Sequence, residues 1–285
     1  SLPCSSFHRK PIVNDNTSPI TKLLTKLELE SISTNEFVGG SGVGGVTVEN
    51  RLFGGLLVAQ AFMAAAHTSS LKLHSLHSYF LRPARPNQPI HFKVSSIKEG
   101  RNFHVRLVEA VQAENEIFHM QASFTREFEG PSHQDTVPEV AEPESCPNRD
   151  ELRGRDKNDA PIDVRMATPI TESEALPPEQ HIWLKPTDNL PENPNLHLAL
   201  LIYASDRTLL DTAWRPHAHL GEHTGASLDH AVWVHNSTDF NRWHLYTMNS
   251  PASGSGRGLA FGGIHDENGR RIISTAQEGV MRLKD

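Results

Sequence analysis

The chain has 285 residues, of which 37% are hydrophobic, and this content suffices for two hydrophobic cores of about 120 residues each. Its 27 basic and 34 acidic side chains give a net charge of −7 with no block of Lys or Arg, so we expect no nucleic-acid binding. The longest apolar run, residues 198–204, is far too short to span a membrane. The two cysteines, Cys4 and Cys146, support neither a disulfide framework nor a zinc site, and they favour a reducing compartment such as the cytoplasm.

The first predicted helix begins after Ser18, which suits an N-cap, and Pro19 occupies the first helical position. Four apolar residues then share one face of the helix: Ile20, Leu23, Leu24 and Leu27. This amphipathic pattern indicates that the helix packs on the body of the protein.

Residues 40–45 (GSGVGG) satisfy the G-x-G-x-x-G pattern of dinucleotide-binding loops. The residues that follow (VTVENR) are strand-like or irregular, so the helix whose N-terminus would hold a pyrophosphate is missing. The pattern therefore favours a loop, and we expect no cofactor.

Two parts of the chain, roughly 150 residues apart, repeat one order of elements. The first copy has a predicted helix over residues 53–66 that contains one polar residue, Gln60, and the second has a helix over residues 195–210 that contains Asp206. Strand-like runs follow each helix: residues 75–83, 101–110 and 117–124 in the first copy, and 227–235, 257–264 and 272–281 in the second. We interpret the chain as two copies of a domain in which a helix precedes an antiparallel sheet.

Residues 130–160 separate the two copies. This segment is rich in Pro and acidic residues and lacks hydrophobic periodicity, so it predicts a surface linker. We therefore expect an N-terminal domain over residues 18–129, the linker over residues 130–160, and a C-terminal domain over residues 161–285.

Asp206 is the residue that says most about function. Helical spacing places its carboxylate in an apolar stripe with four neighbours: Ile202, Tyr203, Leu209 and Leu210. Because burying an unpaired carboxylate is costly, such a group is usually paired or catalytic. A structural pair with Arg207 or with a backbone amide is the alternative to a catalytic role.

The run HAHLGEH, residues 217–223, is similar to the H-x-H-x-D-H pattern of metal-dependent hydrolases. A binuclear site would also need distant His and Asp ligands from a larger fold, so the pattern favours a solvated loop, and we expect no metal. No G-x-S-x-G nucleophile elbow occurs in the chain, which argues against an α/β-hydrolase.

Five short runs carry a family resemblance: residues 52–55 (LFGG) with Gln60, 77–83 (HSYFLRP), 203–206 (YASD), 227–230 (SLDH) and 277–282 (QEGVMR). In this order they resemble the acyl-CoA thioesterase II family, over nearly the whole chain from Ser18 to Arg282. The resemblance implies an α+β double hotdog, in which two tandem repeats each wrap a long helix in a curved antiparallel β-sheet. It also implies hydrolysis of fatty acyl-CoA to free fatty acid and CoA, and a homo-oligomer.

In that family an Asp, a Thr and a Gln jointly hold the attacking water. The resemblance assigns these roles to Asp206, Ser227 and Gln277, with Ser227 standing where the usual motif has Thr. Serine keeps the hydroxyl but lacks the methyl group that restricts the side chain at χ1. The carboxylate would accept a proton from the water, while the hydroxyl and the amide orient it.

Three residues of the first copy are candidates for substrate binding. Gly54 and Gly55 begin its helix, where backbone amides can polarise the thioester oxygen. Gln60 occupies the position equivalent to Asp206, and a hydrogen bond within the core is its alternative role.

Arg257, together with Arg82 and Arg101, is a candidate for contact with the phosphates of CoA, and a surface salt bridge is the alternative for each. His74 and His77 are alternative bases, or simply strand residues. Two other functions remain open: a broader carboxylester hydrolase that uses the same pocket, and a non-catalytic acyl-CoA binding protein.

Overall fold

A computed structural model describes residues 17–40, 47–48, 51–170 and 173–284. Strands β1 to β8 belong to the first half: β1 (Glu30–Ser33), β2 (Glu36–Gly39), β3 (Thr47–Val48), β4 (Arg51–Leu52), β5 (Lys72–Phe80), β6 (Ile90–Glu99), β7 (Phe103–Gln112) and β8 (Asn115–Thr125). Strands β9 to β15 belong to the second half: β9 (Ile162–Met166), β10 (Glu179–Pro186), β11 (His223–Ser227), β12 (Asp229–Val234), β13 (His244–Gly254), β14 (Arg257–His265) and β15 (Arg271–Leu283).

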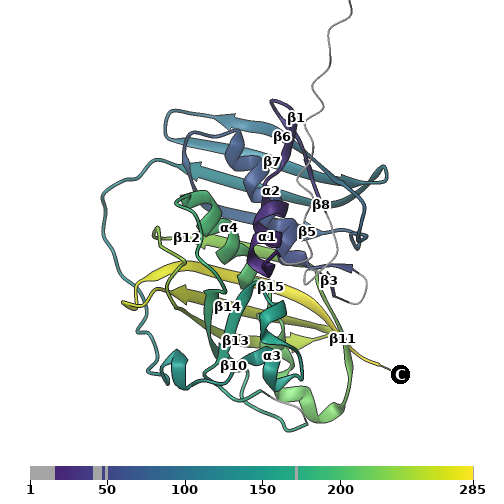
Figure 1. The fold of residues 1–285 in the computed structure, drawn as a ribbon, viewed down its shortest axis with the longest axis vertical. Coiled ribbons are helices and arrows are strands. Elements are labelled where there is room, and N and C mark those ends of the chain that lie inside the picture. Colours follow the sequence, from purple (N-terminus) through teal and green to yellow (C-terminus); the bar gives the residue numbers. More distant parts are fainter. Residues whose placement is uncertain (1–16, 41–46, 49–50, 171–172, 285) are drawn as a thin grey trace, which may run out of the picture.

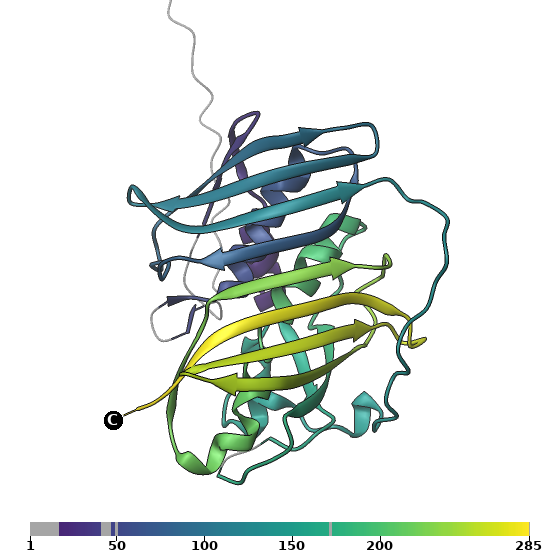
Figure 2. The same ribbon diagram turned by 180° about the vertical axis from the view of Figure 1, so that it is seen from behind.

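The helices of the described residues are fewer and mostly short. They are α1 (Pro19–Leu27), α2 (Gly54–His67), α3 (Arg149–Leu152), α4 (Pro194–Ser205) and α5 (Asp211–Trp214), with the 3₁₀ turns η1 (Pro143–Ser145), η2 (Lys157–Asp159) and η3 (Arg215–Leu220). Figures 1 and 2, seen from opposite sides, show α2 and α4 on one face of the sheet. The other face of the sheet is the one that Figure 2 presents to the viewer.

Both halves share one antiparallel sheet of 13 strands, in the order β1-β2-β6-β7-β8-β5-β12-β15-β14-β13-β10-β9, with β11 also paired to β15. The halves join where β5 pairs with β12, and the register sets Tyr79 opposite Asp229 and Ser75 opposite Trp233. This junction lies in the middle of the strand order, so the core beneath it is common to both halves.

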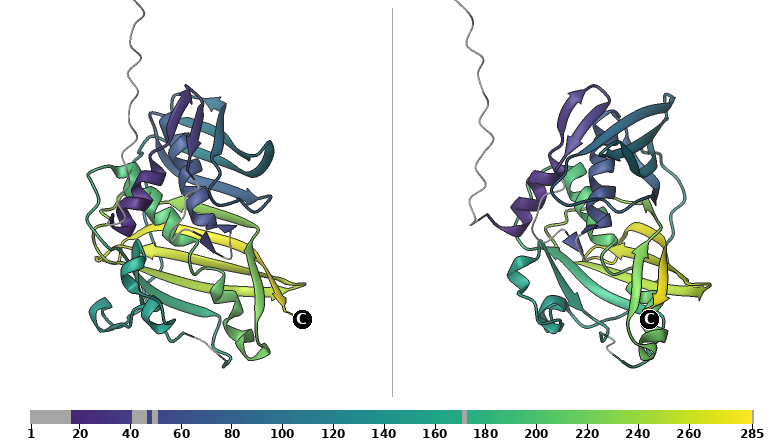
Figure 3. Two further views of the ribbon diagram at one scale, coloured as in Figure 1. Left: turned by 45° about the vertical axis from the view of Figure 1, so that its right-hand side comes forward. Right: turned by 90° about the vertical axis from the view of Figure 1, so that its right-hand side faces the viewer.

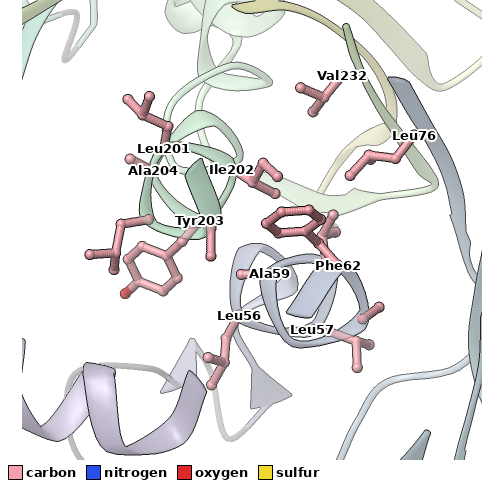
Figure 4. Close-up of a cluster of buried hydrophobic side chains, with 14 of the residues drawn as sticks. Leu56, Leu57, Ala59, Phe62, Leu76, Leu201, Ile202, Tyr203, Ala204 and Val232 are labelled. Atoms are coloured by element: carbon pink, nitrogen blue, oxygen red, sulfur yellow. The ribbon is translucent and has the colours of Figure 1, made fainter. Parts of the chain in front are cut away.

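The helices α2 and α4 form the centre of this core. Both are apolar on nearly every side, which is typical of a helix that is buried all round. Figure 4 shows their side chains meeting beneath the sheet: Leu56, Leu57, Ala59 and Phe62 of α2, Leu201, Ile202, Tyr203 and Ala204 of α4, with Leu76 and Val232 from the strands. A Cβ added at Gly55 would lie 2.4 Å from the carbonyl oxygen of Tyr203, so glycine is what allows the two helices to touch there.

The helix predicted after Ser18 is present. The Ser18 hydroxyl accepts from the backbone N–H of Thr21, and Ile20, Leu23 and Leu27 are buried against the core. Figures 1 and 3 show α1 (purple) beside α2 and α4.

The predicted helix over residues 195–210 ends earlier than expected, at Ser205. Asp206 is its C-cap, with helical dihedral angles, and residues 206–210 form turns before α5. The hydroxyl of Ser205 donates to the carbonyl of Ile202 at 2.8 Å, and such side-chain bonds to the backbone favour helix ends over helix interiors.

The predicted strand over residues 227–235 is two strands, interrupted at Leu228. Asp229 Oδ1 accepts from the backbone N–H of Glu278 at 2.6 Å, so a side chain replaces a carbonyl of the β-ladder at this point. Four long or buried strands, β6, β9, β10 and β13, were not among the predicted elements.

The connector is more ordered than a surface linker. It contains η1, α3 and η2, and three of its polar residues are buried: Asn148, Arg149 and Asp150. Arg149 pairs with Asp211 at 3.0 Å, and this contact ties α3 to α5. Composition did not indicate this burial, because charged residues are buried only when a distant partner is available. The domain boundaries at residues 129 and 161 stay a prediction.

Candidate active site

Three residues predicted to act together meet at one carboxylate oxygen. Ser227 Oγ donates to Asp206 Oδ1 at 3.2 Å, and Gln277 Nε2 donates to the same Oδ1 at 2.5 Å. Ser227 lies 21 residues and Gln277 71 residues along the chain from Asp206, so only the tertiary structure brings them together.

Each residue is held by a different element. Asp206 caps α4, Ser227 ends β11 opposite Gly279, and Gln277 lies within β15 opposite Ala260. A Cβ added at Gly279 would lie 2.3 Å from the Leu210 side chain, so the glycine leaves room for the turn that follows Asp206.

Two of the three residues are buried, and Ser227 is half-buried. Asp206 is 8% exposed and Gln277 1% exposed. Gln277 Oε1 is buried and, among the described residues, has no hydrogen-bond partner. A carboxylate in such surroundings interacts more strongly with its neighbours than it would in water, since solvent screening is weak.

Asp206 and Ser227 line a cavity of about 400 Å³. One part of its lining is apolar: Leu52, Phe53, Leu57, Phe80, Leu81, Pro83, Ala84, Leu210 and Leu228. The other part carries charged or polar side chains: Arg82, Asp206, Arg207, Asp211, His223 and Ser227. The cavity draws on both halves of the chain, and it suits a ligand with an apolar and an anionic part.

The start of α2 reaches the carboxylate from the first half. A Cβ added at Gly54 would lie 2.9 Å from Asp206 Oδ2 and 3.0 Å from Phe80 Cε1, so only glycine fits beside the carboxylate without displacing it. Phe53, the N-cap residue, makes no side-chain hydrogen bond to the first turn. The first-turn amides therefore lack a side-chain cap at the end of the helix where the dipole favours negative charge.

The other predicted substrate contacts are not at the cavity. Gly55 packs on the carbonyl of Tyr203 instead. Gln60 is fully buried, and its Nε2 donates to the carbonyls of Lys26 at 2.9 Å and Gly40 at 3.1 Å, which is the core hydrogen-bonding role given as its alternative. Arg257 forms a half-exposed salt bridge with Glu278 at 3.0 Å.

Two arginines do reach the cavity. Arg82 was among the predicted contacts, and its guanidinium also donates to the carbonyl of Glu116 at 2.6 Å. The sequence offers Arg207 only as a partner of Asp206, but its guanidinium lies 3.9 Å from the buried carboxylate of Asp150. The predicted candidate Arg101 is exposed and does not line the cavity.

The histidines considered as bases lie elsewhere. His74 bonds to Ser123 Oγ at 2.7 Å, and burial lowers its pKa, while His77 packs edge-on against Trp233 at 5.1 Å.

The His-rich run near residue 217 is dispersed by the fold. His217 bonds to Ser253 Oγ at 2.9 Å, and His223 stacks on Trp214 at 3.9 Å. Among the described residues, no group of three or more His, Cys, Asp or Glu side chains is arranged to hold a metal ion. The G-x-G-x-x-G run lies outside the described residues from position 41 to 45. In the part of the chain that the structure covers, no helix combines the length and apolar character needed to cross a membrane.

The fold is that of a protein with two copies of the hotdog domain in one chain. A protein of Alicyclobacillus acidocaldarius described as having a hotdog fold superposes with a TM-score of 0.79 at 16% identity, covering 93% of this chain and 99% of that one. The double-hotdog architecture implied by the sequence motifs is thereby confirmed.

Relatives of higher sequence identity show the family to which the chain belongs. Residues 154–280 match the acyl-CoA thioesterase family, and residues 44–125 match the acyl-CoA thioesterase N-terminal domain. Acyl-CoA thioesterase 2 of Haemophilus influenzae is 34% identical over 93% of this chain and 99% of its own length. An acyl-CoA thioesterase II of Mycobacterium marinum is also 34% identical, with a TM-score of 0.78 over 92% of this chain and 99% of that one. The chain belongs to the acyl-CoA thioesterase family and is a thioester hydrolase.

Proposed function

We propose that the chain hydrolyses fatty acyl-CoA by direct attack of a water molecule that Asp206, Ser227 and Gln277 hold together. The observation that carries this proposal is the convergence of Ser227 and Gln277 on Asp206 Oδ1. With Oδ1 occupied by two donors, the carboxylate is fixed in orientation, and Oδ2 faces Gly54 at the cavity.

In the proposed reaction Asp206 is the general base. The water oxygen forms a bond to the thioester carbonyl carbon while one of its protons passes to the carboxylate. The tetrahedral intermediate then loses its C–S bond, and the proton moves from Asp206 to the departing sulfur. The products are a fatty acid and CoA, and no covalent intermediate with the enzyme is formed.

Ser227 and Gln277 contribute position rather than proton transfer. The Ser227 hydroxyl donates a hydrogen bond to Asp206. The lone pairs of the serine oxygen stay available to accept a hydrogen bond from the water. Gln277 is nearly fully buried, so its amide holds the carboxylate without competition from solvent. Placing the water in this way removes part of the entropic barrier to its attack.

The start of α2 is the proposed site of the oxyanion. Gly54 lines the cavity beside Asp206, and the positive end of the helix dipole lies there. A backbone amide at this position can stabilise the charge that develops on the thioester oxygen.

The cavity lining supports acyl-CoA as the substrate. Its apolar part suits an acyl chain, while Arg82 and Arg207 supply two guanidinium groups for the anionic CoA portion. Simple esters lack that anionic portion, so this lining favours the CoA ester over the carboxylester alternative.

Replacing Asp206 by Asn tests the proposal. The amide keeps the size of the side chain but cannot act as the base, so thiol release from acyl-CoA should fall by about 10²- to 10⁴-fold while substrate still binds. Thermal melting of the same preparation measures the folded fraction. Near-normal turnover per folded molecule would show that Asp206 is not the base.

A further inference from the structure

The residue before Asp206 is held on both its side chain and its main chain. Ser205, the last residue of α4, is fully buried, and its Oγ lies 2.9 Å from Nε2 of His230. Tyr246 donates its hydroxyl proton to the carbonyl oxygen of Ser205 at 2.9 Å, and its own oxygen lies 2.9 Å from Thr275 Oγ1. His230 and Tyr246 come from β12 and β13, so the end of α4 is bound to two strands of the sheet, and Thr275 of β15 holds the Tyr246 hydroxyl.

The hydrogen bonds determine which nitrogen of His230 carries the proton. Ser205 Oγ donates its only proton to the carbonyl of Ile202, so it must accept from His230 Nε2. His230 Nδ1 is buried and has no partner among the described residues. Burial lowers the pKa of His230 in spite of the nearby carboxylates of Asp206 and Asp229. The imidazole is therefore neutral, with its proton on Nε2.

His230 is itself fixed from the other half of the molecule. The hydroxyl of Ser78, in β5, donates to the backbone carbonyl of His230 at 2.8 Å, and both residues are buried. This bond crosses the β5–β12 junction between the two halves. The donor to Ser205 consequently has little freedom to move.

A shift at Ser205 reaches the carboxylate directly. Only one peptide bond separates Ser205 from Asp206, so the position of the helix end sets the direction in which the Asp206 side chain leaves the backbone. Asp206 Oδ1 must lie within hydrogen-bonding distance of both Ser227 and Gln277. These bonds are sensitive to small displacements, because hydrogen bonds weaken steeply with poor geometry.

We propose that His230 is a positioning residue for thioester hydrolysis, which fixes Ser205 through its Nε2–H and so aligns the Asp206 carboxylate with Ser227 and Gln277. It does not line the cavity and is fully buried, so it acts through Ser205 and not on the substrate. The proposal rests on the role of Asp206 as the base.

The direct test compares His230→Leu with His230→Gln. Leucine removes the donor, so kcat should fall by about 10- to 10²-fold while KM is little changed, because the base is misplaced and the substrate-binding lining is not. Glutamine places an amide N–H near the position of Nε2 and should restore most of kcat. A purely structural role would lower the folded fraction in both variants without this split between kcat and KM.

Ser205→Ala provides the second arm, since it removes the same contact by deleting one oxygen. It should lower kcat as His230→Leu does. The double variant Ser205→Ala/His230→Leu should have a kcat no lower than that of the less active single variant, because both substitutions remove the same hydrogen bond. If the leucine variant does not fold, Ser205→Ala and His230→Gln decide the matter by the same criteria. Normal kcat in Ser205→Ala, or additive losses in the double variant, would overturn the proposal.

Val94→Ala is the matched control for loss of packing. Val94 is buried in β6, in the half of the chain that does not contain Asp206, so its truncation should lower stability and leave kcat per folded molecule unchanged. Asp206→Asn in the same assay distinguishes loss of the proposed base from loss of its positioning. If Asp206→Asn is inactive and His230→Leu is fully active, the positioning role of His230 is wrong but the role of Asp206 as the base stands. If Asp206→Asn is active, the role of Asp206 as the base is wrong as well.

Discussion

Gln277 Nε2 and Asp206 Oδ1 are joined by a buried hydrogen bond of 2.5 Å between residues 71 positions apart. The bond links the middle of β15 to the end of α4, and it constrains the carboxylate more strongly than an exposed contact would. Because Ser227 donates to the same oxygen, the second oxygen is the one presented to the cavity beside Gly54.

Ser227→Ala removes one of the two donors to Asp206 together with a hydrogen-bond partner for the water. We expect kcat to fall by about 10²-fold. Ser227→Thr, which restores the hydroxyl and restricts χ1, should preserve or improve kcat. Thiol-release kinetics on the three proteins measure this, and unchanged kcat in the alanine variant would remove Ser227 from the site.

Gly54→Ala should impair catalysis without unfolding the protein. Its Cβ would lie 2.9 Å from Asp206 Oδ2, so the carboxylate must move, and we expect kcat to fall by at least about 10-fold. Alanine is favourable in a helix, which offsets part of the cost of moving Asp206 and Phe80, so the variant should remain folded. Gly130→Ala, where a new Cβ meets nothing within 4 Å, is the matched control and should behave as the parent protein. Equal kcat in both variants would contradict the proposed place of Gly54.

Stability should decrease as the pH falls below neutrality. Burial lowers the pKa of His265 from 6.5 to about 4. The unfolded chain therefore binds a proton between these values that the folded chain does not, and the stability contributed above pH 6.5 is lost as the pH falls toward 4. This one group should cost about 2 kcal/mol between pH 7.5 and pH 5. His230 and His244, whose pKa values burial also lowers, act in the same direction.

Urea unfolding of the parent protein and of His265→Gln at the two pH values measures that contribution. The variant should show the smaller change in unfolding free energy. His91→Gln is the control, since it removes an exposed histidine in place of a buried one. An identical pH dependence in His265→Gln and the parent would show that His265 does not contribute.

Chelation should leave activity intact. In the proposed mechanism the attacking water is held by a carboxylate, a hydroxyl and an amide, so prolonged dialysis against a chelator should not change thiol release. Loss of activity that added zinc restores would require a different mechanism.

The sequence by itself determined the parts of this protein that depend on local pattern. Apolar periodicity and the Ser18 cap located α1 and α2, and the order of five motifs identified the double hotdog before any contact was known. It also singled out Asp206, Ser227 and Gln277, because an unusual carboxylate in an apolar helix coincided with a family motif.

Only the tertiary structure decided the features that depend on distant partners. The helix α4 ends at Ser205 and not at residue 210. At that end the hydroxyl of Ser205 donates to the carbonyl of Ile202 and contacts His230 of β12. The strand predicted over residues 227–235 breaks because the carboxylate of Asp229 takes the N–H of a residue 49 positions away. Gln60, which the sequence pattern matches to Asp206, lies in the core because the carbonyls it bonds belong to α1 and to Gly40, the residue after β2. Periodicity describes which side of an element is apolar, whereas side-chain hydrogen bonds between distant segments decide where an element stops and which polar groups meet.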